Sequence, residues 1–315
     1  MPLLRRIAGR ALAGAAVLLA VMLAVFGLLA AQPGDAASRL DDPRIPPQVR
    51  TAMRQQLALD QPWPARLVGH VRGAVRGDLG WSVARAQPVT DALGRAIGPS
   101  LTLGGVGLAT GLLLGFVVGT WQGYRTGTGV DRWLSRLSLV LVAIPDFWLA
   151  LLLMTLGARV TGVFPVGGWP RDGDVGEALR HLVLPALAIA LLVAARVARY
   201  QRTSVASTRH EGWARAARGR GIGAAGVRWR HVARAAAAPT IALTGLLVPM
   251  VIAGTVFVEV VFAWPGVGRL LLDAVQARDV PLAIGATLAT AAAAVAGSTL
   301  ADVLHAWLDP RVADR

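Results

Sequence analysis

The sequence predicts an all-α membrane protein with six transmembrane helices and with both termini on the cytoplasmic side. Three observations support this prediction: the composition, the spacing of the apolar segments and the distribution of arginine. The chain of 315 residues is 55% hydrophobic and only 16% charged, whereas a soluble domain carries about 25% charged residues. Its mean hydropathy is +0.55. The composition therefore places the chain in the membrane class.

The composition also excludes several kinds of chemistry. The net charge of +14 comes entirely from arginine, because the chain has no lysine. A phosphate-binding loop of the G-x-x-x-x-G-K-[ST] type is therefore absent, so the chain cannot bind ATP in that way. Cysteine is absent too, which excludes disulfides and thiolate metal sites. With five scattered histidines, we expect no catalytic residue, no metal and no cofactor bound by this chain.

Six apolar segments are long enough, or nearly so, to cross about 30 Å of hydrocarbon as helices. The first resembles a secretory signal, but its apolar stretch exceeds the ~7–15 residues of a signal core, so we expect a retained helix. The expected organisation is a transmembrane helix at 1–31, an extracytoplasmic loop region at 32–95, a core at 96–308 and a cytoplasmic tail at 309–315. The six segments are residues 11–31, 100–121, 134–158, 181–198, 240–262 and 282–307.

The arginines orient these helices. Residues 196–234 hold ten arginines and one acid, Glu211, and positively charged loops stay on the cytoplasmic side. Loops 159–180 and 264–280 balance arginine with acids, so they are expected outside. The loop 32–99 is also expected outside despite its nine arginines, since the bias weakens in loops longer than ~60 residues.

The second apolar segment carries glycines at intervals of four residues, at Gly107, Gly111, Gly115 and Gly119. Such a stripe allows another helix to approach closely, because association in lipid relies on van der Waals contact. We therefore expect these glycines to pack helices and to carry no chemistry. Pro145 interrupts the third segment and predicts a kink or a break there.

Two acids lie at or near membrane depth. Asp146 follows Pro145, and Glu259 lies late in the fifth apolar segment. Intramembrane acids are costly and usually face a bundle interior or a cavity. A helix-packing role and a pathway-lining role both remain open for them.

The stretch 213–239, WARAARGRGIGAAGVRWRHVARAAAAP, carries six arginines and no acid. We expect one short helix over about residues 211–220, a break at the glycines that follow, and then a second short helix. In the second helix Trp229, Val232, Ala233 and Ala236 share one face, so it is predicted to be amphipathic.

Several interpretations of this basic stretch are possible. Nucleic-acid binding is disfavoured because no recognition motif accompanies the arginines. A helix on the membrane surface would suit anionic lipid headgroups. A plain positive loop would explain the charge, but it would explain neither the glycines nor the apolar face.

The same stretch resembles the cytoplasmic EAA loop of permease subunits in binding-protein-dependent ABC importers. More narrowly, it is similar to that of the B-type subunit of oligopeptide/dipeptide permeases. GDLGWSV at 77–83, IPDFWL at 144–149 and EVVFAWPGVGRLLLDAVQARDVP at 259–281 also resemble elements of that family, in the same order. The residues that match the loop itself are Arg215, Ala216, Ala217, Arg218, Gly221, Ile222, His231, Arg234 and Pro239.

The resemblance implies the type I ABC importer permease fold in the bacterial cytoplasmic membrane, with the coupling loop at 210–239. The implied partners are a second, homologous permease subunit in a heterodimer, two cytoplasmic ATPase subunits that bind ATP and Mg²⁺, and an extracytoplasmic substrate-binding protein. No nucleic acid is implied. The nine matching residues would contact an ATPase. The residues expected at the pathway or gate are Asp146, Glu259, Trp264, Pro265, Gly266 and Gly268.

The ligand implied by the resemblance is a di- or oligopeptide, with nickel, glutathione, a haem-like group or a sugar as alternatives. The sequence departs from the family pattern at Asp146, where serine is frequent, at Gly219, where alanine is usual, and at His305, where tyrosine is frequent. A secondary transporter is disfavoured because no inverted repeat is evident. An intramembrane enzyme is disfavoured because no catalytic motif is present.

Overall fold

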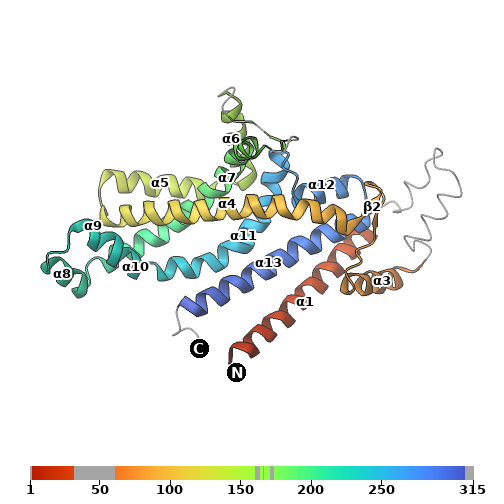
Figure 1. Cartoon of the computed structure of the whole chain (residues 1–315), viewed down its shortest axis with the longest axis horizontal. Coiled ribbons are helices and arrows are strands. Elements are labelled where there is room, and N and C mark those ends of the chain that lie inside the picture. The colour runs from red at the N-terminus through yellow and green to blue at the C-terminus, as the bar shows by residue number, and fades with distance from the viewer. Residues whose placement is uncertain (1, 32–60, 160–163, 166, 171–173, 309–315) are drawn as a thin grey trace. The chain divides into compact units, whose positions relative to one another are not determined.

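The computed structural model describes residues 2–31, 61–159, 164–165, 167–170 and 174–308, and this part of the chain is almost entirely helical (Figure 1). The predicted tail at 309–315 and residues 32–60 of the predicted outer loop lie outside the described residues. The chain divides into two units. Unit 1 combines Met1–Pro99 with Pro265–Ala293, and unit 2 combines Ser100–Trp264 with Ala294–Arg315. Helices α4 (Val89–Tyr124) and α13 (Val280–Leu308) contribute to both.

Unit 1 contains short elements together with parts of the long helices. A hairpin pairs β1 with β2 in antiparallel register, so that Trp81 lies opposite Pro88. The core of this unit joins the start of α4 to the chain after residue 265, where Leu93, Leu270 and Leu282 are buried together. Besides α4 and α13, the elements are α1 (Pro2–Ala31), α3 (Trp63–Val75), β1 (Trp81–Ser82), β2 (Gln87–Pro88) and α12 (Val267–Gln276).

A buried acid fixes the hairpin in unit 1. The Asp279 side chain is 3% exposed, and it accepts hydrogen bonds from Ser82 Oγ at 2.6 Å and from Ala84 N at 2.9 Å. Its second oxygen accepts from Leu282 N at 3.2 Å, which caps the start of α13. One side chain therefore joins the hairpin to the entry of a long helix.

Unit 2 is organised around one long helix, α7 (Val175–Thr208), which begins at an N-cap formed by Asp174. This helix packs against α5 (Gly129–Ala143), α6 (Asp146–Arg159) and α11 (Ala238–Val261) (Figure 1). The core between them consists of aliphatic side chains such as Ile189, Leu247 and Val258. Between α7 and α11 the chain forms α8 (Gly212–Gly219), α9 (Ala224–Gly226), the π-helix η2 (Val227–Val232) and α10 (Ala233–Ala235).

The glycine stripe of α4 lies against α7 in unit 2. A Cβ added at Gly107, Gly111 or Gly115 would lie 2.6–2.7 Å from the Cβ of an α7 residue, namely Ile189, Val193 or Val197. At Gly119 an added Cβ would lie 2.6 Å from a backbone oxygen of α7, that of Ala198. Gly123 continues the stripe by one further turn, against Val205. Five glycines therefore allow the two helix backbones to approach closely.

The structure supports most of the predicted membrane spans but not all six. Among the described residues, α4, α7, α11 and α13 are long and apolar enough to cross a membrane, and a bent helix pair raises the number to at most five. In α1 the apolar part is Leu12–Leu28, which is shorter than in those four helices.

The kink or break predicted at Pro145 is confirmed, and it divides the segment 134–158 between two helices. Helix α5 ends at Ala143, α6 begins at Asp146, and the two axes are bent by 109°. The cause is Pro145, because a proline disfavours helical backbone in the residue before it. That residue, Ile144, has an extended conformation with φ −74° and ψ 132°.

Candidate functional site

The basic stretch 213–239 forms a defined turn between short helices. Helix α8 ends in a Schellman motif: Gly221 N donates to Arg218 O at 3.0 Å, and Ile222 N donates to Ala217 O at 3.4 Å. Gly221 has a φ of +79°, a left-handed conformation that glycine adopts without steric cost. Ile222 and Ala217 both pack on the same small core, as the hydrophobic contact of this motif requires.

That small core seats the segment on unit 2. It contains Val205 from α7, Ala214 from α8, and Val227, Val232 and Ala236, all of which are fully or almost fully buried. The predicted apolar face of the second helix is thus only partly correct. Val232, Ala233 and Ala236 are buried, but Trp229 is 40% exposed and Val227 takes its place. The cause is η2, whose i→i+5 hydrogen bonds bring Val227 in line with Val232.

The opposite side of the segment is basic and exposed. Of the nine residues that match the EAA loop, only three are half-buried: Ala217, Ile222 and His231. Trp213 and Trp229 are 43% and 40% exposed beside them. The six matching residues that are exposed are Arg215, Ala216, Arg218, Gly221, Arg234 and Pro239.

Two polar anchors lie at this end of unit 2, of which the first contacts the segment, and sequence reasoning did not identify either. Gln201 of α7 is 0% exposed. Its Nε2 donates to Thr120 Oγ1 at 3.1 Å and to Ala233 O at 3.4 Å, and its Oε1 accepts from Thr240 Oγ1 at 2.7 Å. One amide therefore joins α4 and α7 to the end of the segment.

The second anchor is an ion pair. Arg202 of α7 donates from Nε and Nη2 to the two oxygens of Asp131, at 2.6 and 2.7 Å. Gly127 N and Gln122 Nε2 donate to the same carboxylate at 2.8 and 3.0 Å. This bidentate geometry fixes the turn between α4 and α5 to the last part of α7.

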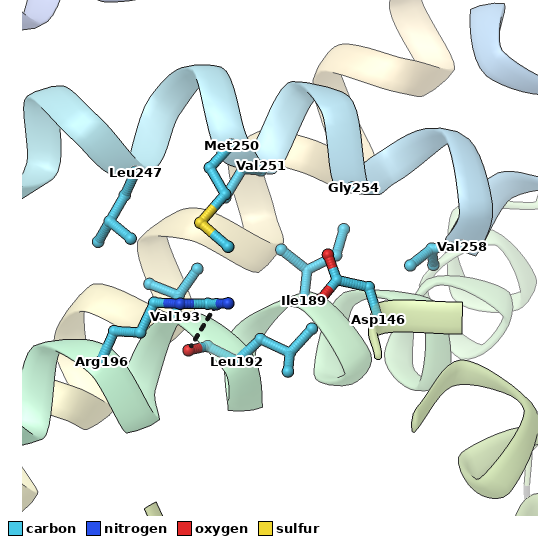
Figure 2. Close-up of a pocket in the computed structure, with 10 residues that line it drawn as sticks. All are labelled: Asp146, Ile189, Leu192, Val193, Arg196, Leu247, Met250, Val251, Gly254 and Val258. Atoms are coloured by element: carbon cyan, nitrogen blue, oxygen red, sulfur yellow. Dashed lines mark hydrogen bonds between the residues drawn. The ribbon is translucent and has the colours of Figure 1, made fainter. Parts of the chain in front are cut away.

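Of the residues expected at the pathway, Asp146 lines a pocket in unit 2. The pocket lies among α6, α7 and α11, and its volume of about 20 Å³ is enough for one water molecule. Figure 2 shows the Asp146 carboxylate and the Arg196 guanidinium on the same pocket, with Arg196 Nη1 donating to Leu192 O at 3.2 Å. Gly254 makes room for the acid, since a Cβ there would lie 2.8 Å from Asp146 Oδ2.

The other expected pathway residues lie elsewhere. Glu259 is 1% exposed and accepts a hydrogen bond from Ser100 Oγ at 2.6 Å, so it is buried among helices of unit 2. Trp264, which is 1% exposed, packs edge-to-face on Trp169 with ring centroids 4.8 Å apart. Pro265, Gly266 and Gly268 belong to unit 1, where the two glycines are buried at the start of α12.

No group of three or more His, Cys, Asp or Glu residues that could hold a metal ion occurs in the described part of the chain. The site therefore consists of a basic helical segment, its anchors and a helix bundle of membrane type.

These features define a multi-pass membrane component with an exposed basic segment. The family model for the binding-protein-dependent transport system inner membrane component matches residues 111–314. The chain belongs to this family, and it is a multi-pass protein of the bacterial inner membrane.

Related proteins agree with this assignment over nearly the whole chain. A Brucella suis protein assigned as a peptide permease is 35% identical over 98% of this chain and 99% of its own length. The oligopeptide transport system permease protein AppB of Bacillus subtilis is 30% identical over 96% of this chain and 97% of its own. OppB of Mycobacterium tuberculosis, of the same description, is 34% identical over 86% of each. The resemblance drawn from the sequence motifs is confirmed.

Proposed function

We propose that this chain is a permease subunit of an ATP-driven importer of di- and oligopeptides, in which a separate binding protein delivers the ligand. The family supports the transport role, and the relatives named above support the peptide class. The chain would form half of the translocation path with a second, homologous permease subunit. Two ATPase subunits would supply the energy, since the sequence has no lysine for a phosphate-binding loop.

The exposed segment 213–239 is the feature on which the coupling proposal rests. It is held by a buried core and by Gln201, while both tryptophans and five of its six arginines are exposed. A rigid element of this kind can pass on the movement of an ATPase by rigid-body displacement. We assign ATPase contact to the nine residues that match the EAA loop, with Gly221 at its turn.

The proposal includes a topology of six crossings with both termini in the cytoplasm. In this topology α1 and the bent pair α5–α6 each count as one crossing, in addition to the four long apolar helices. The segment 213–239 then lies in the cytoplasm, where the ATPases are.

Substitution at Gly221 tests the coupling. In Gly221→Arg, a side chain is forced into the left-handed region at a cost of about 1–2 kcal/mol, so the turn after α8 should change direction. We expect ATP-driven uptake of a labelled peptide into proteoliposomes of the complete transporter to fall at least about tenfold, while membrane insertion and basal ATP hydrolysis persist.

The matched control is Gly129→Arg. It adds the same charge at an exposed glycine that has ordinary backbone geometry and open space around it. The control should transport peptide normally.

Wild-type levels of uptake and of stimulated ATP hydrolysis in Gly221→Arg would show the coupling assignment to be wrong. If the transporter took up nickel, glutathione, haem or a sugar with ATP and took up no peptide, the proposed peptide ligand would be wrong.

A further inference from the structure

Helix α7 has one polar face that no element of the described chain covers fully. Arg196, Arg199, Tyr200, Thr203, Ser204 and Ser207 follow the spacing i, i+3, i+4, i+7, i+8 and i+11, so they share one side of the helix. They line an open groove in unit 2 with a volume of about 730 Å³. Other sides of α7 are occupied, because Val193 and Val197 meet the glycine stripe and Arg202 binds Asp131.

The walls of the groove are apolar and come from two other helices. Val142 of α5 lines one wall, and Pro239 and Leu243 of α11 line another. Pro239 is also the last residue of the segment 213–239. The wall of the groove therefore begins where the proposed coupling segment joins α11.

The charges of the groove are unbalanced. Arg196 is shared with the small pocket that holds Asp146. For Arg199, the structure shows no bonded carboxylate among the described residues, and its side chain is exposed. Arg199 directly follows the apolar segment 181–198, at the expected cytoplasmic end of the span, and an arginine side chain beside lipid is costly unless it meets water or a counter-charge. This face is thus unsuited to lipid tails and suited to an aqueous path.

The donors that remain in the groove select an anion. The hydroxyls of Thr203 and Ser207 already donate to carbonyls of their own helix. The donors that remain include the hydroxyls of Tyr200 and Ser204 and the guanidinium of Arg199. Of these three, only the guanidinium is charged, and it matches a carboxylate in a bidentate manner. The groove volume lies within the ~300–1,000 Å³ of small-molecule sites.

We propose that this groove is a carboxylate-binding stretch of the translocation path, and that Arg199 binds the C-terminal carboxylate of the peptide in transit. The inference rests on the proposed importer function. Val142 and Leu243 would contact peptide side chains without selecting among them, while the carboxylate is common to all peptides.

The test compares two forms of one labelled tripeptide, the free acid and its C-terminal amide. Uptake is measured in proteoliposomes that contain the complete transporter and its binding protein. The acid-to-amide ratio of kcat/KM for each variant is divided by that of the wild type, so that selection by the binding protein cancels. For Arg199→Gln we expect a fall of about tenfold in this ratio, the equivalent of one charge-assisted hydrogen bond. Arg199→Lys should restore part of it.

Arg132→Gln is the control, since it removes an exposed arginine of α5 outside the groove and should leave the ratio unchanged. An Arg199→Gln variant that transports both peptides normally, or both equally poorly, would overturn the inference. So would an effect that depends only on the anionic lipid content of the vesicles, because that would make the ligand a lipid headgroup. A wild-type transporter that takes up neither peptide would instead refute the importer proposal.

A binding measurement tests the groove without transport. In detergent, the free acid should raise the Tm of the purified permease complex, followed by tryptophan fluorescence, more than the amide does. The Arg199→Gln variant should lose this difference. Equal shifts for acid and amide in the wild type would contradict the inference.

Discussion

Asp131 binds several polar groups at one end of the unit 2 bundle. It is 2% exposed, and it binds Arg202, Gly127 and Gln122 at the same time. Each of these partners comes from a different place in the chain, and Arg202 is 71 residues away. This acid therefore determines where the end of α7 lies relative to the α4–α5 turn.

Loss of this carboxylate should destabilise the protein. Asp131→Asn leaves Arg202 partly buried without its counter-charge, which we expect to cost about 2–3 kcal/mol, somewhat less than for a fully buried pair. Thermal unfolding in detergent, followed by tryptophan fluorescence, should show a lower Tm. Asp273→Asn is the control, because its ion pair with Arg85 is 41–44% exposed and such pairs contribute little. A Tm for Asp131→Asn equal to that of the control would contradict this role.

At this scale the sequence predicted less than the structure shows. The sequence indicates a special role for Asp146 and Glu259, because an acid within an apolar segment is rare. Gln201, Asp131 and Asp279 were not noticed, because each lies in a polar or mixed stretch and has partners far away, as in the 197-residue separation of Ser82 and Asp279. No local pattern reveals which polar residue will find a distant partner. For the same reason the sequence did not predict the groove along α7, whose other walls come from α5 and α11.

Among the elements, α4 and α7 are in close contact along the glycine stripe. The stripe reads directly from the sequence, and the structure adds its partner residues and a fifth glycine, Gly123. Pro145 likewise predicted a break, although the bend of 109° between α5 and α6 depends on packing that the sequence does not encode locally. The face of the second coupling helix was predicted with a period of 3.6 residues, and the π-helix changes that period.

A single methyl group in this interface should separate the helices. In Gly115→Ala the new Cβ would lie 2.6 Å from Val197 Cβ and 2.8 Å from Ala194 O, and the second contact is with backbone that cannot rotate away. We expect a loss of about 1–3 kcal/mol, measured as a lower Tm in detergent. Gly105→Ala lies on the same helix with nothing within 4 Å, so it should be neutral or slightly stabilising. Equal Tm values for the two variants would refute the close contact.

For the whole molecule, the central question is how the bent pair α5–α6 relates to the membrane. As a broken span it carries the chain across, whereas as a re-entrant loop it returns the chain to the same side. Arginine placement predicts that Thr128, before the pair, is cytoplasmic and that Val175, after it, is outside. The natural absence of cysteine allows this to be tested without background labelling.

Single-cysteine variants should give opposite results on the two sides of the bent pair. Val175→Cys and Gln276→Cys should react in intact cells with a thiol reagent that cannot cross membranes. Thr128→Cys and Trp213→Cys should react only after permeabilisation. Thr128 and Val175 are chosen because they flank the pair. Gln276 reports the expected outer loop, and Trp213 reports the expected cytoplasmic loop. Labelling of Thr128 and Val175 from the same side would make the pair re-entrant and would exclude six crossings.

The length and continuity of α7 have a consequence for timing. Between Ala186 and Thr208 this helix contains neither proline nor glycine, so it has no point at which one half could move before the other. The same stretch carries the contacts to the glycine stripe, the arginines of the groove and the anchors Gln201 and Arg202. If the segment 213–239 couples to an ATPase as proposed, a displacement of α7 would move the groove together with these contacts. Ligand release and the movement of the coupling segment would be simultaneous events rather than successive steps.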